Sequence, residues 1–454
     1  MLKAPSYRKH RDVVRGLAML VQMARVSPFR PYRYSPKAGD LATLVTQPYD
    51  KIPDALREQY LQASPNNFVR LIKGQTLDGD DGAHNVYSRA SDTLEEWIQQ
   101  GILAQDPDPG FYAYFQEFDH PETGANTIRK GFIGLTDVEE YDKGVVHRHE
   151  LTHSGPKMDR WKLTEATQSY FGQLLFLYDD PTRRVDELLD AAAIGQPLMA
   201  AREPDGVTHK VWRMSDPGQV AEIQRLMADK KLLIADGHHR YETALAYGLE
   251  HPETPGASQV MVTLVNISSP GLVVLATHRV LSDLPDFERG QLLEQASRRF
   301  EIRRLATDDA LRQALEAEPH SGAAIGLVLA GDDGRYLLTP KPGALQDILE
   351  GLSEAEKRLD VVLLHRALIG EAAGLSEDDV RELKGIRYVR GFANAIAEVA
   401  SGASQAAFLL RPADIKDVAH ISFSGVVMPQ KSTDFYPKLL SGFTTYRFGQ
   451  PTAK

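Results

Sequence analysis

The chain has 454 residues, of which 42% are hydrophobic and 25% are charged, and its formal net charge is −10. This length exceeds one ordinary hydrophobic core, so we expect two closely packed domains or one large α/β unit with an added lobe. The acidic balance makes a nucleic-acid partner unexpected, and the absence of cysteine excludes disulfides, cysteine nucleophiles and thiolate metal sites.

Residues 1–27 are predicted to form an N-terminal extension. Basic residues precede the short apolar run 16–24, as in a secretory signal, but the run contains Gln22 and leads to Arg25 without a clear cleavage site. We expect an amphipathic helical extension here, or a mis-set start codon. Since no run approaches the roughly 20 apolar residues of a membrane span, we expect a cytoplasmic protein with no membrane partner.

Hydrophobic periodicity predicts mixed α and β structure in the first part of the chain. Residues 28–34 look extended. Strands are predicted at residues 41–45, 66–73, 111–118, 130–138, 171–177, 209–214, 231–235, 260–267 and 272–281, the last two joined by a turn at 268–271. Helices are predicted at residues 54–62, 92–103, 184–193, 220–229 and 241–249.

The pattern breaks at residues 283–286, so we predict a first region at 28–282 and a second α/β region at 283–454. In the second region a strong hairpin signal lies at residues 331–334. Strands are predicted at residues 323–329, 335–338, 406–410 and 426–428, and helices at 287–299, 353–369 and 394–400.

The densest group of candidate functional residues follows the predicted strand 231–235 and consists of Asp236, Gly237, His238, His239 and Arg240. In a strand–turn–helix unit the first N–H groups of the helix lack partners and the helix dipole adds positive charge, so an anion is favoured. The glycine lets the main chain approach a ligand, and the arginine can hold a phosphate or carboxylate. The aspartate can bind a cation or take a proton, and the histidines can act as acids, bases or donors. The alternative is a solvated turn in which the aspartate only caps the helix.

A second polar block begins with His149 and Glu150. His149 and His153 are four residues apart and match the zinc-protease pattern His-Glu-x-x-His. However, Gly155 and the following proline end any helix promptly, and no third ligand is evident.

Three charged residues, Lys157, Asp159 and Arg160, follow in the same block. We expect a basic, histidine-lined loop that orients a phosphorylated or carboxylated ligand. The alternatives are a bound transition metal and a solvated surface segment.

Near the C-terminus, Lys431, Ser432 and Thr433 follow a predicted strand. Lysine supplies a point charge for phosphate, and the hydroxyl groups can donate to phosphate oxygens or bind magnesium. The segment is not a P-loop, because Pro429 stands where a glycine-rich arm would be. The alternative is a turn with a Ser/Thr helix cap.

Two weaker candidates are Asp50, at the end of a predicted strand, and His278, within one. Neighbouring side chains in a strand point to opposite faces, so only one of His278 and Arg279 can face a cleft. We expect His278 to do so.

The turn at residues 235–240 resembles the Asp-Gly-His-His-Arg turn of the ParB-like superfamily, which includes free-serine kinases and the nucleotide-binding domain of chromosome-partitioning ParB proteins. The chain as a whole is identified as a member of the bacterial and archaeal family called domain of unknown function 1015. This resemblance rests on residues 47–50, 149–150, 157–160, 235–240, 277–279, 428–433 and 435–438.

The resemblance implies an α+β or mixed α/β fold, with a large mixed sheet and a ParB-like strand–turn–helix site for a nucleotide or anion. It also implies a phosphotransferase that uses magnesium and ATP or ADP and acts on free serine or a similar small molecule. In this hypothesis Asp236, Glu150 and the two histidines 238 and 239 are catalytic. The phosphates are held by Gly237, Arg240, Lys157, Arg160, Lys431, Ser432 and Thr433, and all the blocks converge on one cleft.

Two other functions stay open. One is a nucleotide-dependent binding or switch protein by analogy with ParB, although the acidic charge and the lack of a recognisable helix-turn-helix segment argue against it. The other is a metal-dependent hydrolase that uses the histidines. The sequence leaves the acceptor, the donor nucleotide and the oligomeric state undetermined.

Overall fold

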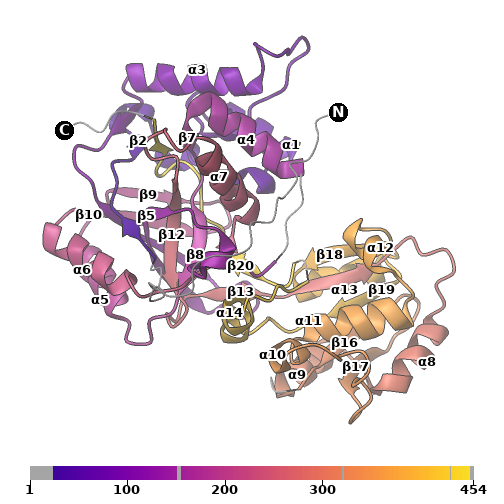
Figure 1. Ribbon diagram of the computed structural model, residues 1–454. Coiled ribbons are helices and arrows are strands. Elements are labelled where there is room, and N and C mark those ends of the chain that lie inside the picture. The colour runs from indigo at the N-terminus through magenta and orange to yellow at the C-terminus, as the bar shows by residue number, and fades with distance from the viewer. Residues whose placement is uncertain (1–23, 151–154, 320–321, 430, 450–454) are drawn as a thin grey trace, which may run out of the picture.

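The computed structural model describes residues 24–150, 155–319, 322–429 and 431–449. Figure 1 shows a larger lobe built on a nine-stranded sheet and a smaller lobe built on a six-stranded sheet. The chain is therefore a mixed α+β protein with a large mixed sheet, as predicted. None of the described helices has both the length and the apolar composition of a membrane span.

The large sheet contains both parallel and antiparallel pairs. Strands β4 and β5 form the predicted antiparallel pair, and β11 lies between β6 and β8. In spatial order the strands are β6 (Val146–His147), β11 (Leu232–Asp236), β8 (Leu174–Tyr178), β12 (Gln259–Asn266), β5 (Asn126–Asp137), β4 (Phe111–Asp119), β10 (Thr208–Met214) and β9 (Met199–Arg202). The short strand β1 (Val26–Ser27) also pairs with β5, so part of the predicted extension belongs to the sheet, while residues 1–23 lie outside the described residues.

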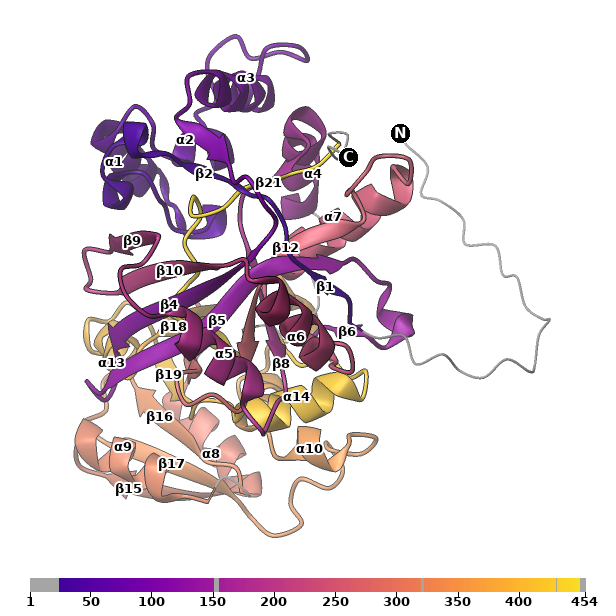
Figure 2. The ribbon, with the colours of Figure 1, turned by 90° about the vertical axis from the view of Figure 1, so that its left-hand side faces the viewer.

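Helices of the large lobe form two groups, as Figures 1 and 2 show. The first group lies near the end of the sheet where β11 stops, and within it α4 packs against both α3 and α7. The first group contains α1 (Asp54–Ala63), α2 (Val69–Ile72), α3 (Val86–Gln99), α4 (Gly155–Thr167) and α7 (His238–Glu250), and the second contains α5 (Arg184–Ala192) and α6 (Pro217–Met227).

The small sheet is antiparallel and includes the predicted hairpin, whose strands β16 and β17 flank residues 331–334. Its spatial order is β15 (Phe300–Leu305), β17 (Arg335–Pro340), β16 (Ile325–Leu329), β19 (Ala406–Leu409), β14 (Thr277–Leu281) and β18 (Ile386–Arg390). The helices of this lobe are α8 (Arg289–Arg299), α9 (Asp308–Ala317), α10 (Glu354–Lys357), α11 (Asp360–Leu363), the π-helix η5 (Leu364–Ala372), α12 (Glu377–Arg381) and α13 (Phe392–Ala400).

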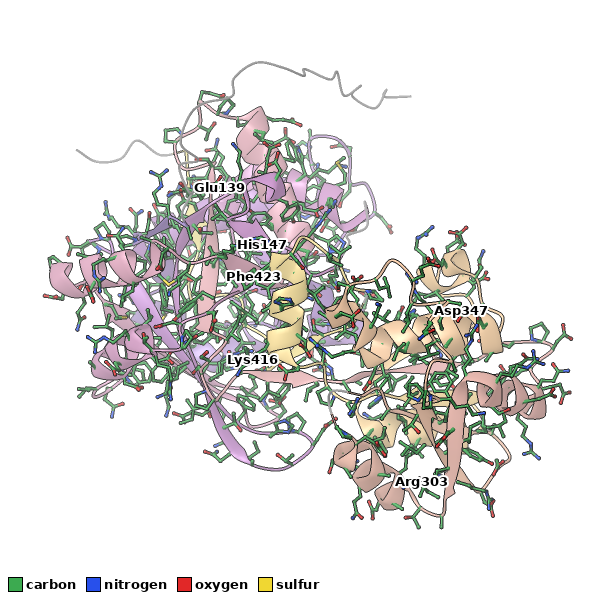
Figure 3. All side chains as sticks on the ribbon, turned by 60° about the horizontal axis from the view of Figure 1, so that its bottom comes forward. Glu139, His147, Arg303, Asp347, Lys416 and Phe423 are labelled. Atoms are coloured by element: carbon green, nitrogen blue, oxygen red, sulfur yellow. The ribbon has the colours of Figure 1, made fainter. Side chains whose placement is uncertain are left out.

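The C-terminal segment returns from the small lobe to the large one. Helix α14 (Ile415–Phe423) lies against the edge of the large sheet, where the rings of His147 and Phe423 are 5.1 Å apart (Figure 3). Beyond it, β20 (Asp434–Tyr436) pairs with β13 (Val273–Leu275), and β21 (Tyr446–Arg447) pairs with β7 (Ser169–Tyr170). Residues from the end of the chain thus reach the large lobe close to β11.

Several local predictions were wrong. Residues 41–45 and 66–73 are not strands but contain the 3-10 helix η2 (Leu41–Thr43) and helix α2, because the carboxylate of Asp40 and the amide oxygen of Asn67 accept hydrogen bonds from the first N–H groups of these turns. The predicted helix 353–369 is broken before Asp360, whose carboxylate binds Arg411 and the amide of Ala324.

The segment 268–271 joins β12 to β13, as predicted, and the two strands lie in different sheets. The remaining short elements are β2 (Tyr32–Tyr34), β3 (Leu103–Gln105), and the 3-10 helices η1 (Pro36–Ala38), η3 (Tyr49–Lys51) and η4 (Tyr141–Lys143).

Candidate functional site

The predicted strand–turn–helix unit is present, with β11 ending at Asp236 and α7 beginning at His238. Gly237 between them has φ = 99°, and a Cβ added there would lie 2.6 Å from Cδ2 of Leu174, so only glycine fits this turn without strain. Gly237 is the N-cap residue of the helix and makes no side-chain cap hydrogen bond. Because this residue offers no capping oxygen to the first N–H groups of α7, the helix terminus favours an anion.

Asp236 does not cap the helix; its carboxylate is bound by two cations. A β-bulge between Ile234 and Asp236 turns the end of β11. The Oδ1 atom lies 3.0 Å from Nζ of Lys438, and Oδ2 lies 3.0 Å from a guanidinium nitrogen of Arg240. Burial alone raises the pKa of Asp236, but these two charges outweigh it and hold the pKa well below its usual range. The carboxylate is ionised at neutral pH.

Lys438 extends this ion pair into a chain of alternating charges. Its Nζ also lies 3.1 Å from Oδ1 of Asp434, which in turn accepts from Arg390 of β18. Burial lowers the pKa of Lys438, but the charges of Asp236 and Asp434 outweigh that effect and raise it. The chain therefore joins the large lobe, the C-terminal segment and the small lobe.

The backbone around Lys438 is held by buried polar groups of the large sheet. Arg129, of which 1% is exposed, donates to the carbonyl oxygens of Tyr436 and Pro437 and to the side chain of Gln116. The amide of Gln116 donates to the carbonyl of Lys438 at 2.9 Å. Burial lowers the pKa of Arg129 to about 10, which still leaves it cationic at neutral pH. These bonds fix the position of the lysine relative to β11.

Lys51 and Lys431 add two further cations to this region. Burial lowers the pKa of Lys51, repulsion from Lys438, Lys431 and Arg390 lowers it further, and the carboxylate of Asp50 partly offsets this by raising it. Lys431 is exposed. Asp50, also exposed, forms no hydrogen bond or ion pair with another described residue.

His149 is hydrogen-bonded to the strand that precedes the turn and is thereby held in one tautomer. Its Nδ1 is 2.8 Å from the carbonyl oxygen of Ile234, which can only accept, so Nδ1 carries the proton. Burial lowers the pKa of His149, and the neutral ring therefore offers the lone pair of Nε2 to the hydroxyl of Thr433 at 2.8 Å.

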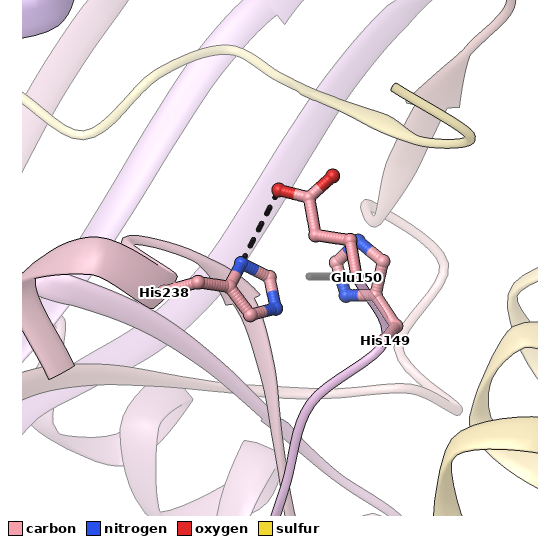
Figure 4. A group of neighbouring side chains, drawn as sticks. All are labelled: His149, Glu150 and His238. Atoms are coloured by element: carbon pink, nitrogen blue, oxygen red, sulfur yellow. Dashed lines mark ion pairs between the residues drawn. The ribbon is translucent and has the colours of Figure 1, made fainter. Parts of the chain in front are cut away.

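His238 and Glu150 complete a compact group with His149, which Figure 4 shows. The rings of His149 and His238 are 4.6 Å apart, and Nδ1 of His238 lies 3.4 Å from Oε1 of Glu150. Burial, with the nearby His149, lowers the pKa of His238 well below its ordinary value. Its Nε2 is buried and has no hydrogen-bond partner within the described part of the chain. Glu150 keeps 22% of its side chain exposed.

Arg160 and Asp159 lie beside the central turn and bind one another. Arg160 stacks over the ring of Tyr49 at 4.0 Å and donates to the carboxylate of Asp159 at 2.9 Å. Arg160, Arg240 and Tyr49 line one small cavity of about 50 Å³. Arg160, Asp159 and Asp50 also line a larger one of about 370 Å³. The structure thus places the residue blocks 47–50, 159–160 and 236–240 next to one another.

Other predicted residues lie elsewhere or make other contacts. Lys157 is paired with Glu242 on α7, and the hydroxyl of Ser432 donates to the carbonyl of Pro429. His239 is half-buried at the start of α7. His153 and Gln430 lie outside the described residues.

His278 lies in the core of the small lobe. Its Nδ1 accepts from the amide of Leu410 at 3.2 Å, and its ring packs on Phe392. The neighbouring Arg279 is the one that reaches the carbonyl of Lys431, at 3.2 Å. The alternation along the strand is as expected, but the side chain directed to the C-terminal loop is the arginine.

Sequence reasoning did not select four of the charged residues in this site: Lys51, Arg390, Asp434 and Lys438. Lys438 belongs to the resembling block 435–438, Asp434 lies between that block and the block 428–433, and Lys51 directly follows the block at 47–50. The motifs could therefore have led to these three positions from the sequence alone. Arg390 carries no local signal, because it joins the site only through the packing of the two lobes.

Three comparisons place the chain among known proteins. Solved structures similar to it include a free serine kinase in complex with AMP (13% identity, 67% of this chain and 88% of that chain, TM-score 0.34). They also include a mutant of free serine kinase in complex with ADP (13%, 73% and 95%, TM-score 0.35) and a conserved hypothetical protein from Pyrococcus furiosus (14%, 66% and 91%, TM-score 0.32). No curated protein matches the chain. The model of the family described as "Protein of unknown function (DUF1015)" matches residues 26–362, and the chain belongs to that family.

Proposed function

We propose that this protein is a nucleotide- and magnesium-dependent phosphotransferase that acts on the hydroxyl group of a small molecule such as free serine. One observation carries the proposal: five cations gather at the N-terminus of α7, whose N-cap is a glycine, in a protein whose net charge is −10. These cations are Arg240, Lys438, Arg390, Lys51 and Lys431. Four carboxylates, of Asp236, Asp434, Asp50 and Glu150, offset them, which leaves an excess of one positive charge for phosphate groups.

The basic groups and the helix terminus suit the phosphates of a nucleotide. Arg240 is held by Asp236 and by the carbonyl of Gln173 at 2.8 Å, so its guanidinium is preorganised. Lys438 is fixed in the same way between two carboxylates. Phosphoryl transfer asks mainly for positioning and charge neutralisation, and preorganised cations supply both without further reorganisation. The turn's resemblance to that of free-serine kinases agrees with this use.

The two carboxylates considered for catalysis differ in their surroundings. Asp236 is bound by two cations and is too weak a base to take a proton, so we assign it the positioning of Lys438 and Arg240. Glu150 is partly exposed and its described neighbour is a neutral imidazole. In the proposed step the acceptor oxygen bonds to the terminal phosphorus, the bond from phosphorus to the bridging oxygen of the donor breaks, and Glu150 takes the hydroxyl proton.

The oxygen donors of the site fit magnesium only if the nucleotide brings most of its ligands. Both carboxylates nearest the turn, those of Asp236 and Asp434, are already engaged by cations. Asp50 and the hydroxyl of Thr433 are the oxygen donors that remain near the basic groups. Magnesium ordinarily keeps several waters and binds through one or two carboxylates together with phosphate oxygens, which matches this supply.

The test is a product assay on the purified full chain. The protein is incubated with magnesium and ATP or ADP, together with a panel of free amino acids that includes serine, and phosphorylated products are measured by ³¹P NMR and mass spectrometry. We expect one amino acid or related alcohol to be phosphorylated by the wild type and by the control Lys384→Gln, which changes an exposed lysine of the small lobe. The variants Glu150→Gln and Lys438→Gln should lose at least about 100-fold in rate.

Other outcomes separate the remaining functions. Nucleotide binding that Lys438→Gln abolishes, without any phosphorylated product, would favour the nucleotide-dependent switch. The absence of nucleotide binding by the wild type would overturn both hypotheses.

A further inference from the structure

The group formed by His149, Glu150 and His238 has features that the phosphate site does not use. One ligand-type atom from each residue lies within 4.8 Å of the other two. The three residues come from two separate segments, and the backbone bond from the amide of Met428 to the carbonyl of His149, at 2.8 Å, fixes one of them. Figure 4 shows the carboxylate turned toward the His238 ring, with His149 beside it.

Both imidazoles are neutral, so each can act as a metal ligand rather than as an acid. The Nδ1–H of His149 donates to the carbonyl of Ile234, which leaves Nε2 as the atom with a lone pair. A backbone carbonyl that holds the other ring nitrogen is the usual outer support of a metal-bound histidine. His238 is 3% exposed, and its Nε2 has no hydrogen-bond partner within the described ranges. Nδ1 faces Oε1 of Glu150 at 3.4 Å, so Nδ1 is the ring atom placed to share an ion with that carboxylate, and Nε2 keeps the ring proton.

The spacing of the group also fits a metal ion. Two ligand atoms about 2.1 Å from a tetrahedral ion lie roughly 3.4 Å apart. The contact between Nδ1 of His238 and Oε1 of Glu150 is 3.4 Å, longer than an ordinary hydrogen bond. The widest pair, within 4.8 Å, has to close by at most about 1.4 Å, which small side-chain rotations supply.

We propose that His149, Glu150 and His238 bind one divalent first-row transition ion, such as zinc, directly beside the phosphate site. Two imidazoles and one carboxylate favour such an ion over magnesium or calcium, which prefer oxygen ligands only. Three protein ligands leave a further coordination position for water or a ligand.

The hydroxyl of Thr433 currently occupies the lone pair of His149 Nε2, at 2.8 Å. Metal binding therefore requires this hydroxyl to turn away. Thr433 belongs to the loop that carries Lys431, so the ion and the phosphate-binding loop are coupled: when the ion takes Nε2, the hydroxyl is released toward the phosphate site.

The test uses the metal alone, so its outcome is separate from that of the phosphotransferase assay. Glu150 serves both proposals: Oε1, which faces His238, would bind the ion, and the other carboxylate oxygen would take the acceptor proton. The full chain is freed of metal by chelation and dialysis and then titrated with zinc by calorimetry, and with cobalt(II) by visible absorption. The variants are Glu150→Gln and His238→Asn. The matched control is His84→Asn, which removes an imidazole that is 89% exposed and lies outside the group.

We expect one equivalent of zinc to bind the wild type and the control equally, and cobalt to give the intense visible bands of a four-coordinate site. Each cluster variant should bind zinc at least about 100-fold more weakly. Circular dichroism and thermal unfolding establish that the variants are folded; if His238→Asn is not, the partly exposed Glu150→Gln decides the matter. Binding of zinc with equal affinity by Glu150→Gln and the wild type, or no stoichiometric binding by the wild type, would overturn the proposal.

Discussion

At the scale of single residues, the ionised state of each charged group in the site depends on its oppositely charged partner. Asp236 without Lys438 and Arg240 would be a partly buried carboxylate with a raised pKa, and the lysine without its carboxylates would be a buried cation with a lowered one. Since each group shifts its partner toward the charged form, the cluster stays fully ionised across the neutral range. We therefore assign Asp236 to positioning and leave proton transfer to Glu150.

His278 gives a prediction about pH and stability. Burial lowers its pKa to about 4, whereas an unfolded histidine titrates near 6.5. A histidine whose folded pKa is lowered contributes stability above its unfolded pKa, and that stability is lost as the pH falls toward the folded pKa. Between pH 6.5 and 4 the wild type should lose about 3 kcal/mol of unfolding free energy through this residue.

The measurement is urea unfolding between pH 4 and 7. In His278→Asn the amide oxygen replaces Nδ1 as acceptor for the amide of Leu410, and the side chain no longer titrates. This variant should show a flatter pH dependence than the wild type. Equal slopes would mean that His278 is not held neutral.

At the scale of elements, the strand–turn–helix at β11 and α7 depends on Gly237. Gly237→Ala forces a non-glycine residue into the left-handed region and brings a methyl group against Leu174. We expect a loss of about 2–5 kcal/mol in unfolding free energy. The control is Gly290→Ala in α8, where a Cβ meets open space, and this variant should be neutral or slightly more stable. Chemical denaturation of both variants checks the prediction, and equal effects would contradict it.

A second element-scale prediction concerns the turn that carries Lys438. Arg129→Met removes the donor to the carbonyls of Tyr436 and Pro437 and should cost about 2–4 kcal/mol in stability, since buried acceptors lose their partner. It should also weaken nucleotide binding about 10-fold although Lys438 itself is unchanged. Denaturant unfolding and nucleotide titration measure the two effects. Loss of stability with full nucleotide affinity would show that Arg129 does not position the lysine.

Local signals predicted the elements that are built locally. The buried run at 232–235 and the glycine after it located β11 and α7, and the residues 331–334 located the hairpin of β16 and β17. The prediction failed at 41–45 and 66–73, where short-range caps by Asp40 and Asn67 favour helical turns over an apolar run. It also missed the pairing of β13 with β20, because no local pattern records a partner in a distant part of the chain.

The site also divides into residues that local sequence signals predicted and residues that only distant segments of the chain contribute. Residues of the turn are neighbours in the sequence, so their chemistry was visible there. The partner of Asp236 is Lys438, 202 residues further on, and Arg390 comes from the other lobe. Only the folded chain brings these charges together.

At the scale of the whole molecule, the C-terminal segment ties the two lobes together beside the turn. It leaves the small sheet after β19, places α14 on the edge of the large sheet and then delivers β20 next to β13. The chain Asp236–Lys438–Asp434–Arg390 follows this path. The basic region therefore lies where the lobes meet, in an otherwise acidic protein.

This charge distribution predicts that nucleotide binding depends on salt. Raising the ionic strength from about 0.05 to 0.5 M should weaken ATP binding several-fold, since screening reduces the attraction of exposed cations, while adenosine binding should change little. Lys51→Gln should reduce the slope of affinity against salt. Calorimetric titrations with both ligands test this, and a salt-independent affinity for ATP would argue against a basic phosphate site.

The central claim, that the cations around Asp236 hold nucleotide phosphates, is tested most directly by titrating ADP with magnesium into the wild type, Lys438→Gln and the control Lys384→Gln. We expect the wild type and the control to bind alike, and Lys438→Gln to bind about 10- to 100-fold more weakly, because a charge-assisted contact to phosphate contributes about 1.5–3 kcal/mol. Unchanged affinity in folded Lys438→Gln would contradict the claim.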